Sequence, residues 1–557
     1  MTIERGSMKA IRAARCPGCL VLLLAGWNLS WPQTVASPAQ PAPGLYRIAG
    51  TVVNSVTGEP VPHAAVAVLA VANSRALRSV FSDDEGRFAL DGLPAAKYQL
   101  TASKRGYMTS FYDPHETFSS AIVTGEGQET EDLTFRLSPG AALRVAVIDD
   151  GGDPVENARI MVFMRRLPGL GERVVQVSNS TTDDAGVLEI SNMPPGTYFV
   201  AVKADPWYAM HAPSGSGGSS GAERKANAAL DVAYPVTYYD GATDEAAAAP
   251  IVLAEGGREQ VTINLHAVPA LHLVAHVPRA QDGSLAMPEL RQSIFGAEVA
   301  VKDFGTGFQP QTGTLEFSGV APGHYELAQG SPQRILELDA SSSVQIDPSA
   351  GTPTAAVNGT LRNASGAGLP DGVNVALAWA DFAHPRPPVR THIAQGEFHF
   401  PAVPQGNWEL WIQNSGKLLP VLSIVESGKT RAGSVITVGE RQLSLAVTVA
   451  QGETRIEGFA RKDGKGLAGA MVVLVPRNPD ANPDLFWRDQ SDSDGSFSLR
   501  DVAPGSYTIV AIEDGWTLEW ARYATIHRFL PKGIPVTVMG NSGKLIQLAE
   551  PVPVQSR

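Results

Sequence analysis

Six aromatic residues that follow expected strands are the best candidates for ligand contacts in this chain: Trp207, Tyr208, Tyr238, Tyr239, Trp516 and Trp520. Flat aromatic rings suit sugar stacking, and they also offer rigid contact area to a protein. Trp516 and Trp520 are four residues apart, so a strand or one helical turn would place both rings on one side. Packing against a β core is the competing interpretation, because buried Trp and Tyr are common in small β domains.

Other residue types that could do chemistry lack the spacing or setting that catalysis needs. None of the 11 histidines is followed three residues later by Glu, the pair with which a zinc carboxypeptidase holds its metal. His272 and His276 could share a strand face as metal ligands, but a polar strand face is the simpler interpretation. His63 and His115 each follow a proline and are expected to be solvated. A G-x-S-x-G pattern at 217–221 lies in a Gly/Ser-rich stretch, where a loop is expected.

One acidic turn, at residues 490–501, resembles a calcium-binding loop. Ligand-like places in it are held by Asp492, Asp494, Gly495 and Asp501. Gln490 occupies the first position, where an acid is needed, and no helix flanks the turn, so a hairpin turn is the simpler interpretation. We therefore expect no metal, no cofactor and no enzymatic activity.

The first 39 residues have the pattern of an export signal. Four basic residues (Arg5, Lys9, Arg12 and Arg15) precede a short apolar run at 19–27. Small residues follow, with cleavage expected after Ala39 or, alternatively, after Ala36. Trp27 stands where a lipoprotein signal would need its lipidated cysteine. The C-x-x-C pair at 16–19 lies inside the segment to be removed, so a redox role is not expected.

The charge of the mature chain excludes some partners. The whole chain carries a net charge of −12, and the signal contains four basic residues and one acid, so its removal leaves −15. Nucleic acid and anionic lipid both need basic patches, which makes them poor partners. No later apolar run is long enough to span a membrane as a helix, so none is expected to do so.

A pattern repeated five times sets the architecture. It starts at a glycine, continues with apolar residues two and four positions later, turns at a proline and closes on an aromatic twelve positions after the glycine. The five glycines are Gly86, Gly186, Gly313, Gly396 and Gly495, and the closing aromatics are Tyr98, Tyr198, Tyr325, Trp408 and Tyr507. Alternating apolar positions indicate strands, and the proline-containing stretch must turn the chain.

About seven short strands per ~100 residues favour β-sandwiches. We expect an all-β chain of about five tandem seven-stranded sandwiches, Ig-like or prealbumin-like, with the third and fourth copies degenerate. The expected bounds are 45–139, 140–267, 268–350, 351–449 and 450–557. A Gly/Ser-rich insertion at 207–232 in the second sandwich is expected to be flexible.

Two copies resemble a known family. Gly-Thr-Val-Val at 50–53, Thr-Gly-Glu-Pro-Val at 57–61 and Ser-Asp-Asp-Glu-Gly-Arg-Phe at 82–88 resemble the carboxypeptidase regulatory-like domain, and Ser-Asp-Ser-Asp-Gly-Ser-Phe at 491–497 does so about as well. The resemblance implies a transthyretin-type sandwich of the kind found in tandem in exported bacterial proteins. It also implies a non-catalytic domain, the companion of metallocarboxypeptidases, related to starch-binding and collagen-adhesin repeats.

These observations favour a non-enzymatic, exported binding or scaffold protein. Its expected partner is a polysaccharide or a cell-surface protein. An accessory or regulatory part of an extracellular hydrolase or peptidase system is the alternative, and a purely structural spacer is a third. The periplasm, the cell surface and the medium are equally compatible with the sequence.

Overall fold

The computed structural model describes residues 45–557 with several gaps. Those gaps are 72–74, 167–172, 212–228, 280–282, 302–306, 331–332, 365, 367, 370–371, 381–385, 415–416, 432, 450–453, 480–484 and 540–544. The expected export signal at 1–39 and the Gly/Ser-rich stretch at 214–221 therefore lie outside the described residues.

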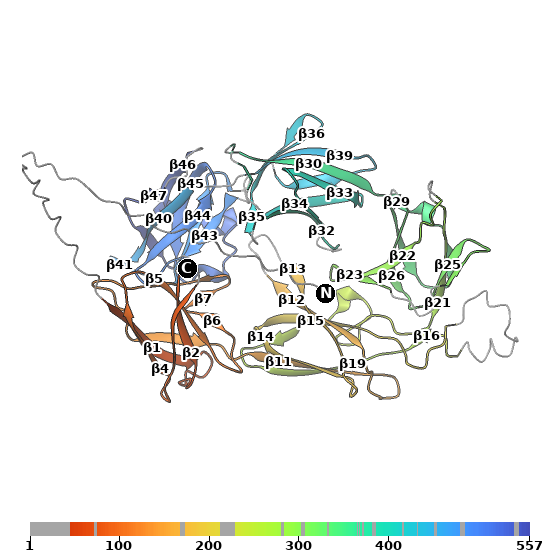
Figure 1. Ribbon diagram of the computed structural model, residues 1–557, viewed down its shortest axis with the longest axis horizontal. Coiled ribbons are helices and arrows are strands. Elements are labelled where there is room, and N and C mark those ends of the chain that lie inside the picture. Colours follow the sequence, from red (N-terminus) through yellow and green to blue (C-terminus); the bar gives the residue numbers. More distant parts are fainter. Residues whose placement is uncertain are drawn as a thin grey trace, which may run out of the picture. The chain divides into compact units, whose positions relative to one another are not determined.

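The described chain is almost entirely β-structure, which confirms the expected all-β sandwich fold (Figure 1). The first sandwich packs sheet β10-β1-β4 against sheet β3-β2-β5-β6, in which β9 also pairs with β5. A small hairpin, β7–β8, extends from it. Bounds are β1 Tyr46–Asn54, β2 Ala65–Ala70, β3 Ala76–Phe81, β4 Arg87–Leu93, β5 Lys97–Ser103, β6 Ser110–Phe111, β7 Pro114–His115, β8 Phe118–Ser119, β9 Ile122–Val123 and β10 Leu133–Leu137.

The second sandwich repeats this arrangement with sheets β14-β11-β19 and β13-β12-β15-β17, and β18 pairs with β15. The short strand β16 pairs with β20, which leads into the third sandwich. Bounds are β11 Ala141–Ile148, β12 Arg159–Arg166, β13 Arg173–Thr181, β14 Val187–Met193, β15 Gly196–Lys203, β16 Val232–Ala233, β17 Thr237–Tyr238, η1 Glu245–Ala247, β18 Ile251–Leu253, β19 Arg258–Asn264 and β20 Val268–Pro269.

The third sandwich packs sheet β24-β25-β21-β28 against sheet β23-β22-β26-β27-β29. A short 3-10 turn, η2, links its last two strands. Bounds are β21 Leu271–His276, β22 Glu289–Ile294, β23 Ala297–Ala300, β24 Gly307–Gln309, β25 Thr314–Val320, β26 Gly323–Gln329, β27 Arg334–Ala340, β28 Val344–Ile346, η2 Pro348–Ala350 and β29 Thr352–Pro353.

The fourth sandwich packs sheet β33-β30-β39-β36-β37 against sheet β32-β31-β34-β35, with β38 on β34. Its bounds are β30 Ala355–Asn363, β31 Val373–Trp379, β32 Val389–His392, β33 Glu397–Val403, β34 Gly406–Asn414, β35 Lys417–Leu419, β36 Val421–Glu426, β37 Lys429–Arg431, β38 Val435–Val438 and β39 Leu443–Val449.

In the fifth sandwich β48 pairs with both β40 and β45, which joins the two layers into one order, β41-β40-β48-β45-β42-β43. Strands β44 and β47 pair with β40, and β46 pairs with β45. Bounds are β40 Thr454–Lys462, β41 Lys465–Gly466, β42 Met471–Pro476, β43 Trp487–Gln490, β44 Ser496–Val502, β45 Gly505–Ile512, η5 Gly515–Thr517, α2 Tyr523–Ile526, η6 His527–Lys532, β46 Ile534–Val538, β47 Leu545–Gln547 and β48 Val552–Gln555.

One pairing scheme recurs in all five sandwiches. The first strand pairs antiparallel with the strand that follows the repeat glycine and parallel with a strand near the end of the sandwich. The first strands are β1, β11, β21, β30 and β40. The sequence repeat is therefore a structural repeat, while independent folding at the expected bounds stays a prediction.

The closing aromatic of the repeat forms the same buried corner in each sandwich. Its ring lies in the core, and its polar atom donates to a backbone carbonyl four residues earlier. The bonds are Tyr98–Pro94 (2.9 Å), Tyr198–Pro194 (2.6 Å), Tyr325–Ala321 (2.7 Å), Trp408–Pro404 (2.9 Å) and Tyr507–Ala503 (2.9 Å). This bond fastens the turn to the strand that follows it and satisfies a polar atom that would otherwise be costly to bury.

Candidate functional site: the aromatic surfaces

Trp207 and Tyr208 lie just after β15 and form the most exposed of the candidate aromatic pairs. The Trp207 side chain is 88 % exposed, whereas Tyr208 is partly buried. Their rings meet edge to face, with centroids 5.7 Å apart. An exposed tryptophan supported by a second aromatic ring can stack on a flat apolar surface of a ligand.

Tyr238 and Tyr239 are not exposed in the same way. Tyr238 is buried against Phe295, the residue at the tip of the β22–β23 hairpin of the third sandwich, with ring centroids 5.5 Å apart. Phe295 also contacts Phe163 and Phe199 on the outer face of the second sandwich. Tyr239 is partly buried against the core of the second sandwich. The third sandwich therefore covers the face on which Tyr238 lies.

Trp516 and Trp520 cover the outer face of the fifth sandwich. Both are partly buried and pack in an apolar cluster with buried residues of β42 and β45, including Met471 and Ile512. The indole nitrogen of Trp516 donates to the carbonyl of Gly469 at 3.0 Å. The segment 513–533, which contains η5, α2 and η6, thus supplies the fifth sandwich with its own cover.

The first sandwich contributes a second layer over these rings. His115 stacks on Trp516 with centroids 4.8 Å apart and an interplanar angle of 11°. The Arg488 guanidinium lies 5.5 Å from the Trp516 ring, 4.5 Å from the Trp520 ring and 5.2 Å from the ring of Phe118. His115 was expected to be solvated; instead it is half-buried between the two sandwiches. A sugar could reach this face of Trp516 only by displacing His115.

The acidic turn at 490–501 uses its carboxylates within the protein. Asp492 accepts from Lys97 and from the backbone N–H of Ala121, both in the first sandwich. Asp494 accepts from the N–H of Ser496. Within the described residues, no group of three or more His, Cys, Asp and Glu side chains is arranged to hold a metal ion.

His272 is the centre of a chain of ionisable groups between the second and third sandwiches. Its Nε2 lies 2.7 Å from Asp231, and its Nδ1 lies 2.8 Å from Glu316, whose carboxylate is buried. His211 contacts the other oxygen of Asp231 at 2.8 Å. Burial alone would lower the pKa of His272, but the hydrogen bonds to the two carboxylates raise it above its usual value. His276, the other half of the expected pair, is exposed.

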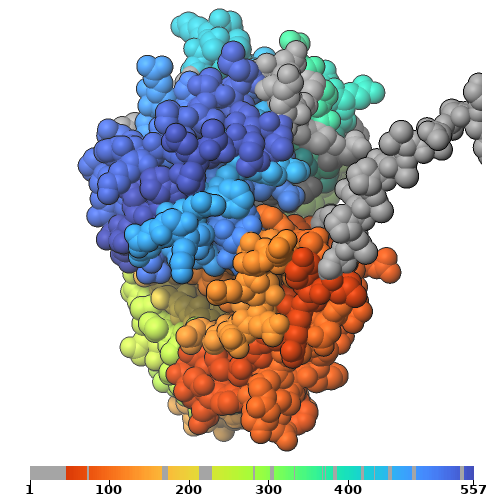
Figure 2. Space-filling view, turned by 90° about the vertical axis from the view of Figure 1, so that its left-hand side faces the viewer, coloured from red at the N-terminus to blue at the C-terminus, as the bar shows by residue number. Residues whose placement is uncertain are grey.

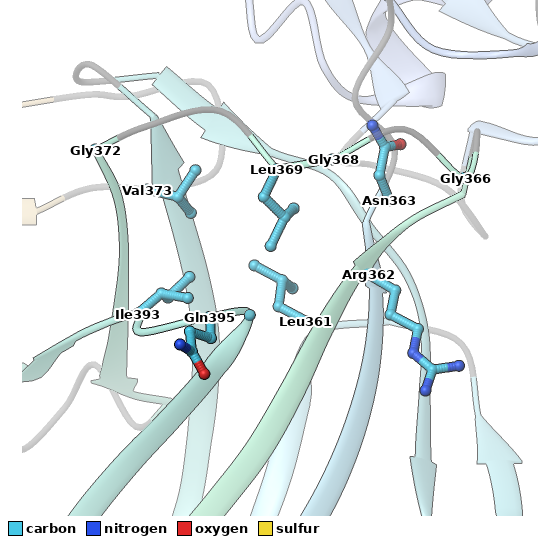
Figure 3. Close-up of a pocket in the computed structure, with 11 residues that line it drawn as sticks. Leu361, Arg362, Asn363, Gly366, Gly368, Leu369, Gly372, Val373, Ile393 and Gln395 are labelled. Carbon is cyan, nitrogen blue, oxygen red and sulfur yellow. The ribbon is translucent and has the colours of Figure 1, made fainter.

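A cavity of about 540 Å³ lies at one end of the fourth sandwich (Figure 3). It is lined by Leu361, Arg362, Asn363, Gly366, Gly368, Leu369, Gly372, Val373, Ile393, Gln395 and Gly396.

One part of the chain matches a family model. Residues 47–138 match the carboxypeptidase regulatory-like domain, which confirms the resemblance predicted for the first sandwich. A comparison with curated proteins finds no match. No helix among the described residues combines the length and the apolar character needed to cross a membrane.

Solved structures similar to this chain include bacterial pilins. A streptococcal ancillary pilin is 10 % identical over 55 % of this chain and 99 % of its own, with a TM-score of 0.18. The Bacillus anthracis TIE protein is 11 % identical over 74 % of this chain and 76 % of its own, with a TM-score of 0.17. The minor pilin GBS52 of Streptococcus agalactiae is 13 % identical over 40 % and 97 %, with a TM-score of 0.19. TM-scores this low describe a distant likeness, and no functional property follows from it.

Proposed function

We propose that this protein is an exported, non-enzymatic scaffold that binds a polysaccharide or a cell-surface protein. The observation that carries the proposal is that the residues repeated in every copy have structural roles. All five closing aromatics make the same buried corner hydrogen bond. The turn carboxylates of the first two copies, Asp83 and Asp183, accept from their own backbone. Because these repeated residues stabilise the fold, we place the binding function on the surfaces that differ between the copies.

Trp207 is the proposed centre of the binding surface. Its ring is exposed, and Tyr208 supports it from the edge. Stacking on a sugar ring would remove this apolar surface from water. The net charge of −12 for the whole chain, and of −15 once the expected signal is removed, favours a neutral glycan over an anionic one, because like charges would repel. Trp516, by contrast, already has a stacking partner within the chain.

The experiment compares the mature chain with Trp207→Ala on an array of neutral and anionic glycans. We expect a neutral glycan to bind and the substitution to weaken binding by about 5- to 150-fold, the range that corresponds to the ~1–3 kcal/mol of a flat ring stacked on one aromatic side chain in nucleic-acid complexes. Phe81→Ala is the matched control, because Phe81 is an exposed aromatic of the first sandwich, 73 % exposed.

Other outcomes separate the competing functions. Retention of a cell-surface protein, lost in Trp207→Ala and kept in Phe81→Ala, would assign the same surface to a protein ligand. Turnover of peptides or esters that a point change abolishes without unfolding would contradict the non-enzymatic proposal. Failure of both glycans and surface proteins to bind would favour a structural spacer or an accessory of a hydrolase system.

A further inference from the structure

The turn at 490–493 of the fifth sandwich differs in one respect from its counterparts in the first two sandwiches. In all three, a hydroxyl residue four positions before the repeat glycine clamps the turn: Ser82, Thr182 and Ser491 each donate to a loop carbonyl and accept a backbone N–H. The next residue is aspartate in each copy. Because the three turns share this hydroxyl arrangement, Asp83, Asp183 and Asp492 occupy equivalent positions.

In the first two sandwiches this aspartate serves its own turn. Asp83 Oδ1 accepts from the N–H groups of Glu85 (3.1 Å) and Arg87 (2.7 Å). Asp183 Oδ1 accepts from Ala185 (3.1 Å) and Val187 (2.8 Å) in the same way. These are the local bonds for which aspartate is favoured in turns.

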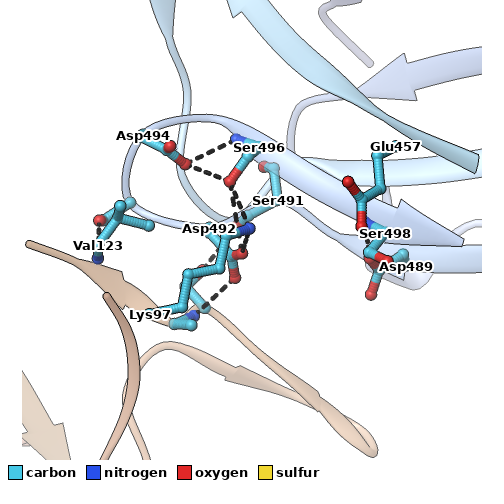
Figure 4. A network of polar contacts seen from close by, with 12 residues as sticks. Lys97, Val123, Glu457, Asp489, Ser491, Asp492, Asp494, Ser496 and Ser498 are labelled. Atoms are coloured by element: carbon cyan, nitrogen blue, oxygen red, sulfur yellow. Dashed lines mark hydrogen bonds and ion pairs between the residues drawn. The ribbon is translucent and has the colours of Figure 1, made fainter. Parts of the chain in front are cut away.

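In the fifth sandwich the equivalent aspartate, Asp492, binds residues of the first sandwich instead of the backbone N–H groups of its own turn. Asp492 Oδ2 accepts from Lys97 Nζ at 2.6 Å, and its Oδ1 accepts from the N–H of Ala121 at 2.9 Å (Figure 4). Within the turn itself, Asp494 accepts a hydrogen bond from the N–H of Ser496 at 2.9 Å. The Asp492 side chain is only 15 % exposed. Burial raises its pKa, and the Lys97 ammonium opposes that shift.

Backbone and buried side chains continue the contact on both sides of this ion pair. The N–H of Ser493 donates to the carbonyl of Ala121 at 2.9 Å, and its hydroxyl accepts from the N–H of Val123 at 2.9 Å. The Gln490 amide donates to the hydroxyl of Ser120 at 2.9 Å, and that hydroxyl donates to the carbonyl of Ser491 at 2.9 Å. Both Gln490 and Ser120 are buried, and the Gln490 amide donates its hydrogen bonds to the first sandwich, to Asp113 and Ser120.

Arg488 adds an ion pair and aromatic contacts at the edge of this interface. Arg488 forms a two-pronged ion pair with Glu116 of the β7–β8 hairpin, one bond of which measures 3.1 Å. Paired carboxylate on one side and aromatic rings on the other hold the guanidinium in place. Figure 2 shows the first sandwich, in red and orange, directly against the blue fifth sandwich.

We infer that the 490–493 turn is a docking surface built for the first sandwich of the same chain. A free fifth sandwich would leave Asp492 without its cation and Gln490 without its hydroxyl partner. Asp492 also lacks the two local backbone bonds that Asp83 and Asp183 accept in the first two copies. Residues almost 400 positions apart are thereby held together.

The test exploits the absence of cysteine after Cys19. The double variant Ala121→Cys/Ser493→Cys is made in the mature chain, residues 40–557. The hydrogen bond between residues 121 and 493 keeps their Cα atoms within the span of a disulfide. We expect mild oxidation to give a monomer with one internal disulfide, seen as a mobility shift without reductant and a mass loss of two hydrogens. Disulfide-linked dimers, or no disulfide, would overturn the inference.

Matched variants test the ion pair and the specificity of the turn. Ala121→Cys/Asp184→Cys pairs residue 121 with the equivalent position of the second sandwich and is expected to stay reduced. Lys97→Met, which leaves the fifth sandwich untouched, should slow formation of the 121–493 disulfide at least tenfold. Asp183→Asn should leave that rate unchanged. An unchanged rate in Lys97→Met, or crosslinking to residue 184, would count against a built docking surface.

Discussion

At the scale of single residues, the corner tyrosine shows how a buried polar atom fixes a turn. Tyr507 donates to the carbonyl of Ala503, and burial raises the pKa of its phenol to about 12. The phenol is therefore the donor throughout the neutral range. The stability it contributes is fully present below its unfolded pKa of about 10 and is lost as pH rises through the folded value.

Tyr507→Phe tests this role. The substitution removes one hydrogen bond and leaves a buried carbonyl without its donor, so we expect a loss of about 1–2 kcal/mol at pH 7. Part of the loss of stability between about pH 10 and 12 should also disappear, because no phenol remains to ionise. Urea denaturation of the full chain at pH 7 and pH 11 measures both effects. Tyr523→Phe, at an exposed tyrosine, is the control; equal effects at the two positions would contradict the corner's role.

At the scale of elements, β21 and the segment before β16 are joined by charge. Both nitrogens of His272 face carboxylates, Asp231 of the second sandwich and Glu316 of the third, and His211 lies on the far side of Asp231. Two carboxylates on one imidazole favour the imidazolium and raise its pKa. Its contribution to stability is thus fully present below the unfolded pKa of about 6.5 and is lost as pH rises through the higher folded pKa.

His272→Gln should therefore flatten the pH dependence of the melting temperature above about pH 6.5, and lower that temperature most at acid pH. The measurement is a series of thermal melts of the full chain between pH 5 and 9. His324→Gln is the matched control, because His324 pairs with Asp339 at the surface and that pair is exposed. A pH dependence that His272→Gln leaves intact would show that the junction does not depend on this ion.

The strands of the repeat could be predicted from the sequence, because alternating apolar residues and turn-forming residues are local signals. The strands that follow Gly86 and Gly495, β4 and β44, and those that contain Tyr98 and Tyr507, β5 and β45, lie where the repeat pattern predicts them. The contact between Lys97 and Asp492 carries no such signal. The residues around Lys97 and around Asp492 are typical of solvent-exposed strands and turns, and Asp492 lies three residues before the repeat glycine, as Asp83 does. Only tertiary structure distinguishes an aspartate that caps its own turn from one that binds a distant lysine.

At the scale of the whole molecule, the second and fifth sandwiches cover their apolar outer faces differently. The fifth uses its own segment 513–533, whereas the second depends on the β22–β23 hairpin of the third. A fragment spanning 140–267 would therefore expose Met161, Phe163 and Phe199, which are buried in the full chain. Apolar patches of this kind promote association.

We expect the 140–267 fragment to aggregate and to bind a hydrophobic dye. A fragment spanning 140–350, which restores the hairpin and Phe295, should be monomeric and bind little dye. Size-exclusion chromatography and dye fluorescence distinguish the two. A monomeric 140–267 fragment with no dye binding would show that the hairpin is not needed as a cover.

The docking of the first sandwich on the fifth also has a mechanical consequence. A pulling force applied at residues 45 and 557 can pass from the first sandwich to the fifth directly through the Lys97–Asp492 contact, instead of through the three sandwiches between them. That direct path is the shorter one, so it bears the tension first. The chain would extend in two stages, by release of this contact and then by straightening of the middle sandwiches, which stay unloaded until the contact opens.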